Sequence, residues 1–239
     1  MSGALQEKVA IVTGGARGIG RAVALALARE GAKLALCSRT AEELKAAAAE
    51  LERLGAQVMA RPADVSQPDH VAAFVDETVG RFGRLDVLVN NAGVGHPHVP
   101  LLELSVEEWD RVLSINLRGA YLMARASIPH MVRQREGSVI NVSSWLGRDA
   151  LTGYGAYGVS KWGMEGITRY LALELKPFGV RVNSVHPGYV ATKMTNYGGA
   201  KPESVVDLFV YLASDASRGI SGQALDVETW RQELQTHRK

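Results

Sequence analysis

The sequence has a single cysteine, few aromatic residues and no excess of charge of either sign. Cys37 is the one cysteine among 239 residues, so no internal disulfide can form, and a lone cysteine suits a reducing compartment. No apolar run approaches the ~20 residues that span a bilayer, and residues 1–7 lack the apolar stretch of a secretory signal. We therefore expect a cytoplasmic protein that is not inserted in a membrane.

The charge balance argues against two further classes of partner. The 27 Lys and Arg residues nearly match the 25 Asp and Glu residues, which leaves a formal charge of +2. Both signs are spread along the chain, so electrostatics gives no reason to expect nucleic acid or a membrane surface as a partner.

What the sequence does contain is an alternation of short apolar runs and longer segments of helical period. Continuous apolar runs are typical of strands buried on both faces, and the helical segments between them suit parallel crossovers. We expect one domain over residues 1–239, an α/β Rossmann-type fold with a doubly wound, parallel, seven-stranded sheet, helices on both faces, and a polar tail at about 229–239. The predicted strands are 9–13, 33–37, 57–60, 87–90, 138–142, 181–185 and 224–227; the predicted helices are 17–29, 41–54, 68–82, 106–133, 157–176 and 202–213.

A glycine-rich turn, T-G-G-A-R-G-I-G at 13–20, joins the first predicted strand to the first helix. Glycines allow a tight turn and a close approach of the backbone to a pyrophosphate, and a helix start offers free N–H groups to an anion. The turn predicts a dinucleotide site that includes Gly14, Arg17, Gly18, Ile19 and Gly20.

The spacing of these glycines resembles the T-G-x-x-x-G-x-G turn of the short-chain dehydrogenase/reductase family, and other landmarks of that family follow in order. Tyr157 and Lys161 fit its Y-x-x-x-K pattern, and Ser144 stands thirteen positions before the tyrosine. The remaining landmarks are Asp64 and Val65 after the third strand, Asn91, Ala92 and Gly93 after the fourth, Asn116 in the long helix, and Pro187, Gly188, Val190 and Thr192 after the sixth.

The resemblance implies a nicotinamide-dependent oxidoreductase with Tyr157 as its acid/base. Tyr157 and Lys161 are four apart on a helix and share one face, so we expect the ammonium to lower the pKa of the phenol. The family implies that Ser144 polarises the substrate oxygen, that Lys161 also binds the nicotinamide ribose, and that Asn116 holds a water linking Lys161 to solvent. Ser143 is the rival of Ser144, because strand alternation points the two to opposite sides.

Cofactor choice follows from charge at the end of the second strand. An acidic residue there would bind the ribose 2′-OH of NAD and repel a 2′-phosphate. This chain has Ser38 and Arg39 instead, with Arg17 as a second cation in reach, and arginine suits phosphate through its fork of donors. We expect NADP(H) to be preferred over NAD(H), and reduction to be the working direction.

The substrate is expected to be a small carbonyl or alcohol compound, free or linked to acyl carrier protein. Arg135 fits one carrier-binding position of the 3-oxoacyl reductase branch, whereas Phe178 stands where that branch has a second arginine. The leading prediction is an NADPH-dependent reductase of a ketone or 3-oxoacyl group. The alternatives are an alcohol or sugar dehydrogenase that works in the oxidising direction with NAD(P), and a dinucleotide-binding sensor without turnover.

Two further expectations concern metal and assembly. His96 and His98 lack obvious further ligands nearby, so we expect no metal site. Family members commonly have a long lid before the last large helix, but only residues 193–201 are available here. We expect a homo-oligomer, a dimer or tetramer.

Overall fold

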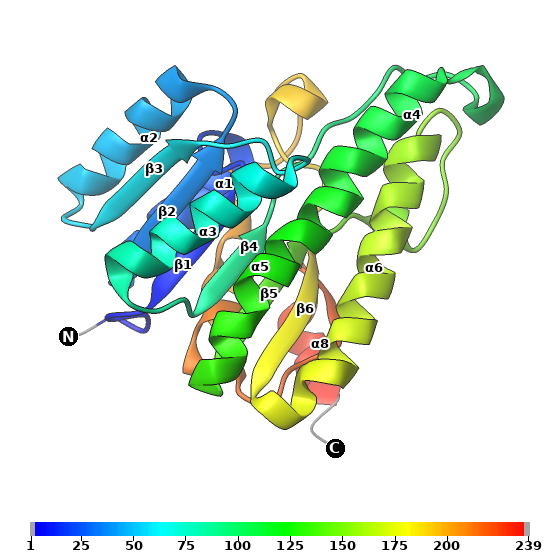
Figure 1. Ribbon diagram of the computed structural model, residues 1–239. Coiled ribbons are helices and arrows are strands. Elements are labelled where there is room, and N and C mark those ends of the chain that lie inside the picture. The colour runs from blue at the N-terminus through cyan, green and yellow to red at the C-terminus, as the bar shows by residue number, and fades with distance from the viewer. Residues whose placement is uncertain (1–2, 237–239) are drawn as a thin grey trace.

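The computed structural model describes residues 3–236, which form a parallel sheet of seven strands with helices on both faces (Figure 1). The strand order is β3-β2-β1-β4-β5-β6-β7, and every neighbouring pair is parallel. The predicted fold class is confirmed, and the predicted strand ends differ by at most two residues. The strands are β1 (Val9–Thr13), β2 (Lys33–Ser38), β3 (Val58–Pro62), β4 (Val87–Asn90), β5 (Gly137–Val142), β6 (Val180–His186) and β7 (Ala224–Asp226).

Two apolar layers cover the sheet, one on each face. Helices α1 (Gly18–Arg29), α2 (Ala41–Arg53) and α7 (Asp207–Ala213) bury their apolar residues against one face. Helices α3 (Pro68–Phe82), α5 (Gly119–Gln134) and α6 (Gly155–Leu175) cover the other face and lie side by side in front of the sheet in Figure 1. The central strands are buried on both sides, which is why their sequences read as unbroken apolar runs.

The winding direction reverses between β1 and β4. From β1 the chain builds outward through β2 and β3, and then returns to pair β4 with the free side of β1 before it continues to β7. In such sheets ligands bind beyond the carboxyl ends of the strands at the point of reversal. The glycine-rich turn after β1 and the residues after β4 meet at this point.

The predicted helix at 106–133 is divided in the structure. Helix α4 (Val106–Leu113) passes through a five-residue π-helical segment, η2 (Ser114–Arg118), into α5. Such π segments are commonly found at functional sites. The predicted helix at 202–213 begins as a 3₁₀ turn, η6 (Pro202–Val205), followed by α7.

The expected polar tail at 229–239 is wrong over the part that the structure describes. Residues Trp230–Thr236 form helix α8. Trp230 and Leu234 are buried with the α7 layer, and the Trp230 ring packs on Tyr211 with ring centroids 4.8 Å apart. Two apolar side chains four positions apart supply an apolar helix face, although the segment between them is polar. Residues 237–239 of the predicted tail lie outside the described residues.

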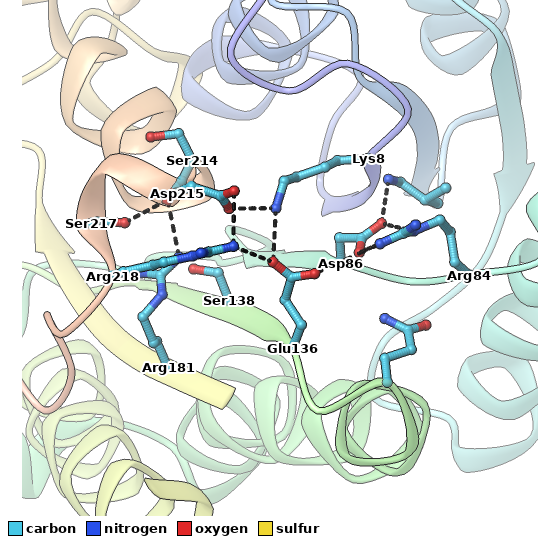
Figure 2. A network of polar contacts seen from close by, with 12 residues as sticks. Lys8, Arg84, Asp86, Glu136, Ser138, Arg181, Ser214, Asp215, Ser217 and Arg218 are labelled. Atoms are coloured by element: carbon cyan, nitrogen blue, oxygen red, sulfur yellow. Dashed lines mark hydrogen bonds and ion pairs between the residues drawn. The ribbon is translucent and has the colours of Figure 1, made fainter. Parts of the chain in front are cut away.

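The amino edge of the sheet holds a network of charged side chains (Figure 2). Lys8 lies 3.3 Å from Glu136 and 2.7 Å from Asp215, and Arg218 contacts the same two carboxylates. Asp86 is buried beside Arg84, which reaches it at 2.6 Å. A cavity of about 970 Å³ opens beside this network, lined in part by Arg135 and Arg181.

Candidate active site

The glycine-rich turn has a backbone that other residues would not adopt. Gly14 and Gly18 have φ of +63° and +54°, in the left-handed region that favours glycine. A Cβ on Gly20 would lie 2.4 Å from both Asn91 Nδ2 and the Gly14 carbonyl oxygen. Helix α1 begins at Gly18, and its N-cap residue Arg17 makes no side-chain capping bond. The first-turn N–H groups therefore face the turn without a side-chain partner, which is the arrangement that suits a phosphate.

Thr13 and Asn91 fasten this turn to the end of β4. Thr13 Oγ1 accepts hydrogen bonds from the N–H groups of Asn91 and Ala92, at 3.0 and 2.9 Å. Asn91 Nδ2 donates to the Thr13 and Gly14 carbonyls, at 2.8 and 3.3 Å. Asn91 therefore shapes the cradle through its amide, and Thr13, quoted in the motif but not assigned a role from the sequence, sets the distance between the two strand ends.

Ser38, Arg39, Asp64 and Val65 line the side of the cavity that follows β2 and β3. Burial raises the pKa of Asp64, but hydrogen bonds from Ser66 and the charge of Arg39 outweigh it and leave that pKa below its ordinary value. Asp64 Oδ1 accepts from Ser66 N and Ser66 Oγ, at 2.9 and 2.7 Å. Arg39 therefore lines this part of the cavity close enough for its charge to lower the pKa of Asp64.

Arg17 is not free in the structure, because it pairs with Glu43. Arg17 Nη1 lies 3.0 Å from Glu43 Oε1, and both side chains are partly exposed at the rim of the cavity. The sequence analysis missed Glu43. Its position in the first turn of α2, directly after the Ser38 and Arg39 segment, is the signal that could have drawn attention to it.

Tyr157 and Lys161 lie on the first turns of α6 and both line the cavity. Lys161 Nζ donates to the Val142 carbonyl at 2.7 Å and lies 5.4 Å from the centroid of the Tyr157 ring. The expected lowering of the phenol pKa is not found: burial raises the pKa of Tyr157, and the nearby Ser144 hydroxyl offsets only part of that rise. The physical reason is that the ammonium is directed at a backbone carbonyl rather than at the phenol.

The two serines after β5 face different surroundings, as strand alternation predicts. Ser144 lies close enough to Tyr157 for its hydroxyl to lower the pKa of the phenol, and its Oγ accepts from Leu146 N at 3.3 Å. Ser143 is 2% exposed, and its hydroxyl faces Glu165, where it helps to lower the pKa of that carboxyl. Ser144, rather than Ser143, is therefore the serine beside the tyrosine.

Asn116 lies in the π-helical segment, fully buried, and does not line the cavity. Its Oδ1 accepts from Val94 N at 2.8 Å, and its Nδ2 donates to the Val94 carbonyl and to Ser160 Oγ at 2.9 and 3.1 Å. The amide thus holds the loop after β4 against α6. The water that family resemblance assigns to Asn116 stays a prediction.

Beyond β6, Pro187, Gly188, Val190 and Thr192 line the cavity opposite the glycine turn. Gly188 has φ of +73°, and a Cβ on Gly18 would lie 3.2 Å from Thr192 Cγ2. The short lid folds into a 3₁₀ turn, η5 (Lys193–Thr195), and Val190 bridges to Ala200. The exposed side chains of Met194 and Tyr197 line the same cavity from this lid.

All site residues predicted from the sequence, except Gly20 and Asn116, line this one cavity of about 390 Å³. His96 and His98, which were considered as metal ligands, do not line this cavity. The His98 ring packs on the Tyr154 ring with centroids 4.1 Å apart, and His96 Nδ1 contacts the Pro97 carbonyl. Within residues 3–236 no group of three or more His, Cys, Asp or Glu side chains has the placement of a metal site. None of the described helices is long and apolar enough to cross a membrane.

A dinucleotide cradle at the reversal point of a doubly wound sheet, with a tyrosine and lysine in the same cavity, defines a nicotinamide-dependent oxidoreductase. Comparison with known proteins agrees. The sequence profile described as short chain dehydrogenase matches residues 8–203. The chain belongs to the short-chain dehydrogenase/reductase family.

Its relatives include reductases and dehydrogenases of different substrates. It is 35% identical to a 3-oxoacyl-[acyl-carrier-protein] reductase of Thermotoga maritima, over 94% of this chain and 97% of that protein. It is 41% identical to a 3-alpha-(or 20-beta)-hydroxysteroid dehydrogenase of Mycobacterium tuberculosis, over 95% of this chain and 90% of that protein. Among solved structures, levodione reductase superposes with a TM-score of 0.90 at 31% identity, over 93% of this chain and 96% of the other. The Mycobacterium avium carveol dehydrogenase in complex with NAD superposes with a TM-score of 0.90 at 30% sequence identity, over 94% of this chain and 97% of the other.

Proposed function

We propose that this protein is an NADPH-dependent reductase of a ketone or 3-oxoacyl substrate. The observation that carries the proposal is the convergence of Tyr157, Ser144 and Lys161 on the cavity that also contains the glycine turn. A bound nicotinamide cofactor supplies the hydride. The protein contributes the proton and the polarisation of the substrate oxygen.

The residues of the cavity fit such a cofactor. The uncapped start of α1 and the glycine cradle suit its pyrophosphate, and Val190 and Thr192 stand where the nicotinamide end would lie. Ser38 and Arg39 leave the end of β2 without a carboxylate, which supports a preference for the 2′-phosphate. Lys161 would hold the nicotinamide ribose.

In the proposed reaction Tyr157 donates its phenolic proton to the carbonyl oxygen as that oxygen gains negative charge. Burial raises the pKa of the phenol, so Tyr157 is protonated at neutral pH but is a weaker acid, and the phenolate that forms needs a stabilising charge. The Ser144 hydroxyl donates a hydrogen bond to the same oxygen and stabilises its developing charge. Lys161 Nζ lies 5.4 Å from the centroid of the Tyr157 ring, where its charge would stabilise the phenolate left behind.

A second function, an alcohol or steroid dehydrogenase working with NAD, is favoured by one contact. Glu43 pairs with Arg17 at the rim where a 2′-phosphate would bind, and a carboxylate there would accept a hydrogen bond from a ribose 2′-OH and repel a phosphate. The pair is solvent-exposed and is worth about 1 kcal/mol or less. A 2′-phosphate that binds two arginines would outweigh it, so the reductase is preferred.

A carrier-linked substrate places a further demand on assembly. Arg135 precedes β5 and lines the cavity at the amino edge of the sheet, whereas Ser144 follows β5 and lines the cofactor cavity, so six strand residues, roughly 20 Å at about 3.3 Å each, separate them. A carrier protein bound at Arg135 would therefore lie at the opposite end of the strand from the active site of its own subunit. The exposed Tyr121, Trp162, Tyr170 and Leu173 on α5 and α6 support a homo-oligomer, and we expect it to work in the cytoplasm.

The test is a fluorescence titration of the purified protein with NADPH and NADH, followed by a panel of ketones, steroids and 3-oxoacyl thioesters monitored by oxidation of the reduced nicotinamide. We expect tighter binding of NADPH and turnover of at least one carbonyl compound. Preference for NADH with oxidation of an alcohol would favour the second function. Tight dinucleotide binding without turnover across the panel would favour the sensor.

A further inference from the structure

A buried carboxylate lies on α6 one helical turn beyond Lys161, and it is bonded to side chains of β6. Glu165 is 5% exposed, and both of its oxygens are bonded to side chains of β6. Oε2 accepts from Ser184 Oγ at 2.7 Å, and Oε1 lies 2.8 Å from His186 Nε2. His186 itself is 2% exposed and directly precedes Pro187 and Gly188 of the cofactor cavity. The carboxylate is therefore fixed to the strand that ends at the site.

This carboxylate belongs to the same packed unit as the proposed catalytic residues. Glu165 and Lys161 are four apart on α6, which puts them on one face with Cβ atoms about 5–6 Å apart. The turn that follows Ser144 presses on both: a Cβ on Gly147 would lie 3.0 Å from the Lys161 carbonyl oxygen and 3.2 Å from Glu165 Cγ. No space separates the Ser144 turn, Lys161 and Glu165.

Lys161 has little else to stabilise its charge. It is 4% exposed, and its Nζ donates to a neutral partner, the Val142 carbonyl. Burial lowers the pKa of Lys161 to about 8, and Glu165 is the charged group that opposes this lowering. Burial also opposes ionisation of Glu165, but hydrogen bonds led by that from His186 leave the pKa of its carboxyl below its ordinary value. A buried ammonium without a counter-charge is costly, and the Glu165 carboxylate acts on it from beyond ion-pair distance, so the charge of Lys161 depends on that of Glu165.

We propose that Glu165 is a positioning residue of the active site, whose carboxylate, fixed by Ser184 and His186, keeps the Lys161 side chain charged beside Tyr157. The inference rests on the proposed reaction, in which a charged Lys161 stabilises the phenolate. Glu165 on α6, with Ser184 and His186 on β6, would then support the tyrosine and lysine without contacting the substrate.

The groups that face the cluster from each packed element are few among the described residues. Lys161 and Tyr157 come from α6, Ser143 from the end of β5, and Ser184 and His186 from β6. On β7, Asp226 is in register with His186, and Arg148 donates to the Ala224 carbonyl of that strand. Of these, Lys161 and His186 are the groups that a change at Glu165 affects most directly.

The variant that tests the proposal is Glu165→Gln, which keeps the shape of the side chain and removes its charge. Its matched control is Ser184→Ala, which removes a hydrogen bond to the same carboxylate and keeps the charge. The first measurement is the titration of Lys161 in the cofactor-free protein by NMR of ¹³Cε-labelled lysine, with the Lys161 signal assigned from its loss in Lys161→Arg. We expect the apparent pKa of Lys161 to fall clearly below about 8 in Glu165→Gln and to stay near its wild-type value in Ser184→Ala.

The second measurement is the pH profile of kcat/KM. Because the active form contains a charged Lys161, the alkaline limb should move to lower pH in Glu165→Gln by the amount of the NMR shift, and it should not move in Ser184→Ala. A purely structural role would lower activity at every pH alike. If Glu165→Gln does not fold, Glu165→Asp retains a charge at a different position, and a smaller fall in the Lys161 pKa is expected.

An unchanged Lys161 titration in a folded Glu165 variant, or an equal shift in Ser184→Ala, would overturn the proposal. The NMR titration needs neither substrate nor cofactor. A wild-type protein that reduces nothing, but whose Lys161 pKa responds to Glu165 as described, would therefore overturn the reaction while the electrostatic pairing stands.

Discussion

Asp86 is the carboxylate through which the structure makes its strongest prediction about stability. The residue lies just before β4, its side chain is 1% exposed, and it accepts three hydrogen bonds (Figure 2). Arg84 donates two of them, from Nε at 2.8 Å and Nη2 at 2.6 Å, and the N–H of Val9, the first residue of β1, donates the third at 2.9 Å. Asp86 therefore ties together the two strands between which the winding direction reverses.

The magnitude follows from what Asp86→Ala leaves behind. The Val9 N–H would lose its side-chain acceptor inside the core, which costs about 1–3 kcal/mol. Arg84 is 44% exposed and would turn to water, so its lost ion pair adds about 1 kcal/mol or less. We expect the free energy of unfolding to fall by about 1–4 kcal/mol, which for a chain of this length lowers Tm by roughly 2–16 °C.

The assay is urea and thermal unfolding of Asp86→Ala beside Asp215→Ala. Asp215 belongs to the same network, contacts Lys8 at 2.7 Å and Arg218 at 3.1 Å, but is 53% exposed. Its loss should cost about 1 kcal/mol or less, since exposed pairs are screened by solvent. A loss of stability in Asp86→Ala no larger than that in Asp215→Ala would refute the reasoning, because burial of the carboxylate would then make no difference.

Three further predictions concern the proposed reaction and its cofactor. Tyr157→Phe keeps the ring and removes the proton donor, so turnover should fall by about 10²–10⁴-fold with NADPH affinity retained in a fluorescence titration; turnover at the wild-type rate would remove Tyr157 from the mechanism. Arg39→Ala should weaken NADPH binding by roughly 10–100-fold and NADH binding much less, since a charge-assisted hydrogen bond is worth about 1.5–3 kcal/mol and only NADPH has the 2′-phosphate. Equal losses for both cofactors would mean that Arg39 does not contact that group. Glu43→Gln should release Arg17 and strengthen NADPH binding by up to about fivefold, the equivalent of the ~1 kcal/mol of an exposed pair, and weaker NADPH binding in this variant would count against the competition between Glu43 and the phosphate.

The proposed acid/base group shows where reasoning from sequence had to be corrected. The spacing of Tyr157 and Lys161 predicted that they share a helix face, and both do line one cavity. It did not predict where the lysine amine points. Nζ donates to the Val142 carbonyl, and burial of the phenol raises the pKa of Tyr157. A side chain with four rotatable bonds selects its partner from the surrounding structure rather than from its neighbours in sequence.

The segment around Asn116 makes a similar point about helices. Helical periodicity over 106–133 predicted one helix, and α4 and α5 do follow one another without a loop. The π-helical segment between them coincides with three hydrogen bonds of the Asn116 amide, which accepts one from Val94 N and donates one each to the Val94 carbonyl and Ser160 Oγ. Those partners come from a different loop and a different helix, so the local pattern contains no sign of them.

The sequence by itself determined the order of strands and helices along the chain, the fold class and a set of site residues that, except for Gly20 and Asn116, line one cavity. These features depend on local patterns: apolar runs that suit buried strands, helical period, and glycines where φ is positive. A sheet with this order then brings the carboxyl ends of its strands to one edge, so residues placed just after strands meet there. The glycine turn, the residues after β4, Ser144 and the Pro187–Gly188 turn were predictable for this reason.

Only the tertiary structure decided which charges face one another. Glu43 meets Arg17, Glu165 meets His186 and Asp86 meets the N–H of Val9, although each pair is separated by twenty or more residues in the chain. It also decided that Trp230 closes the core where a polar tail was expected. Such contacts depend on distances between elements, which are set by how the helices pack on the sheet, and no periodicity within a single segment encodes them.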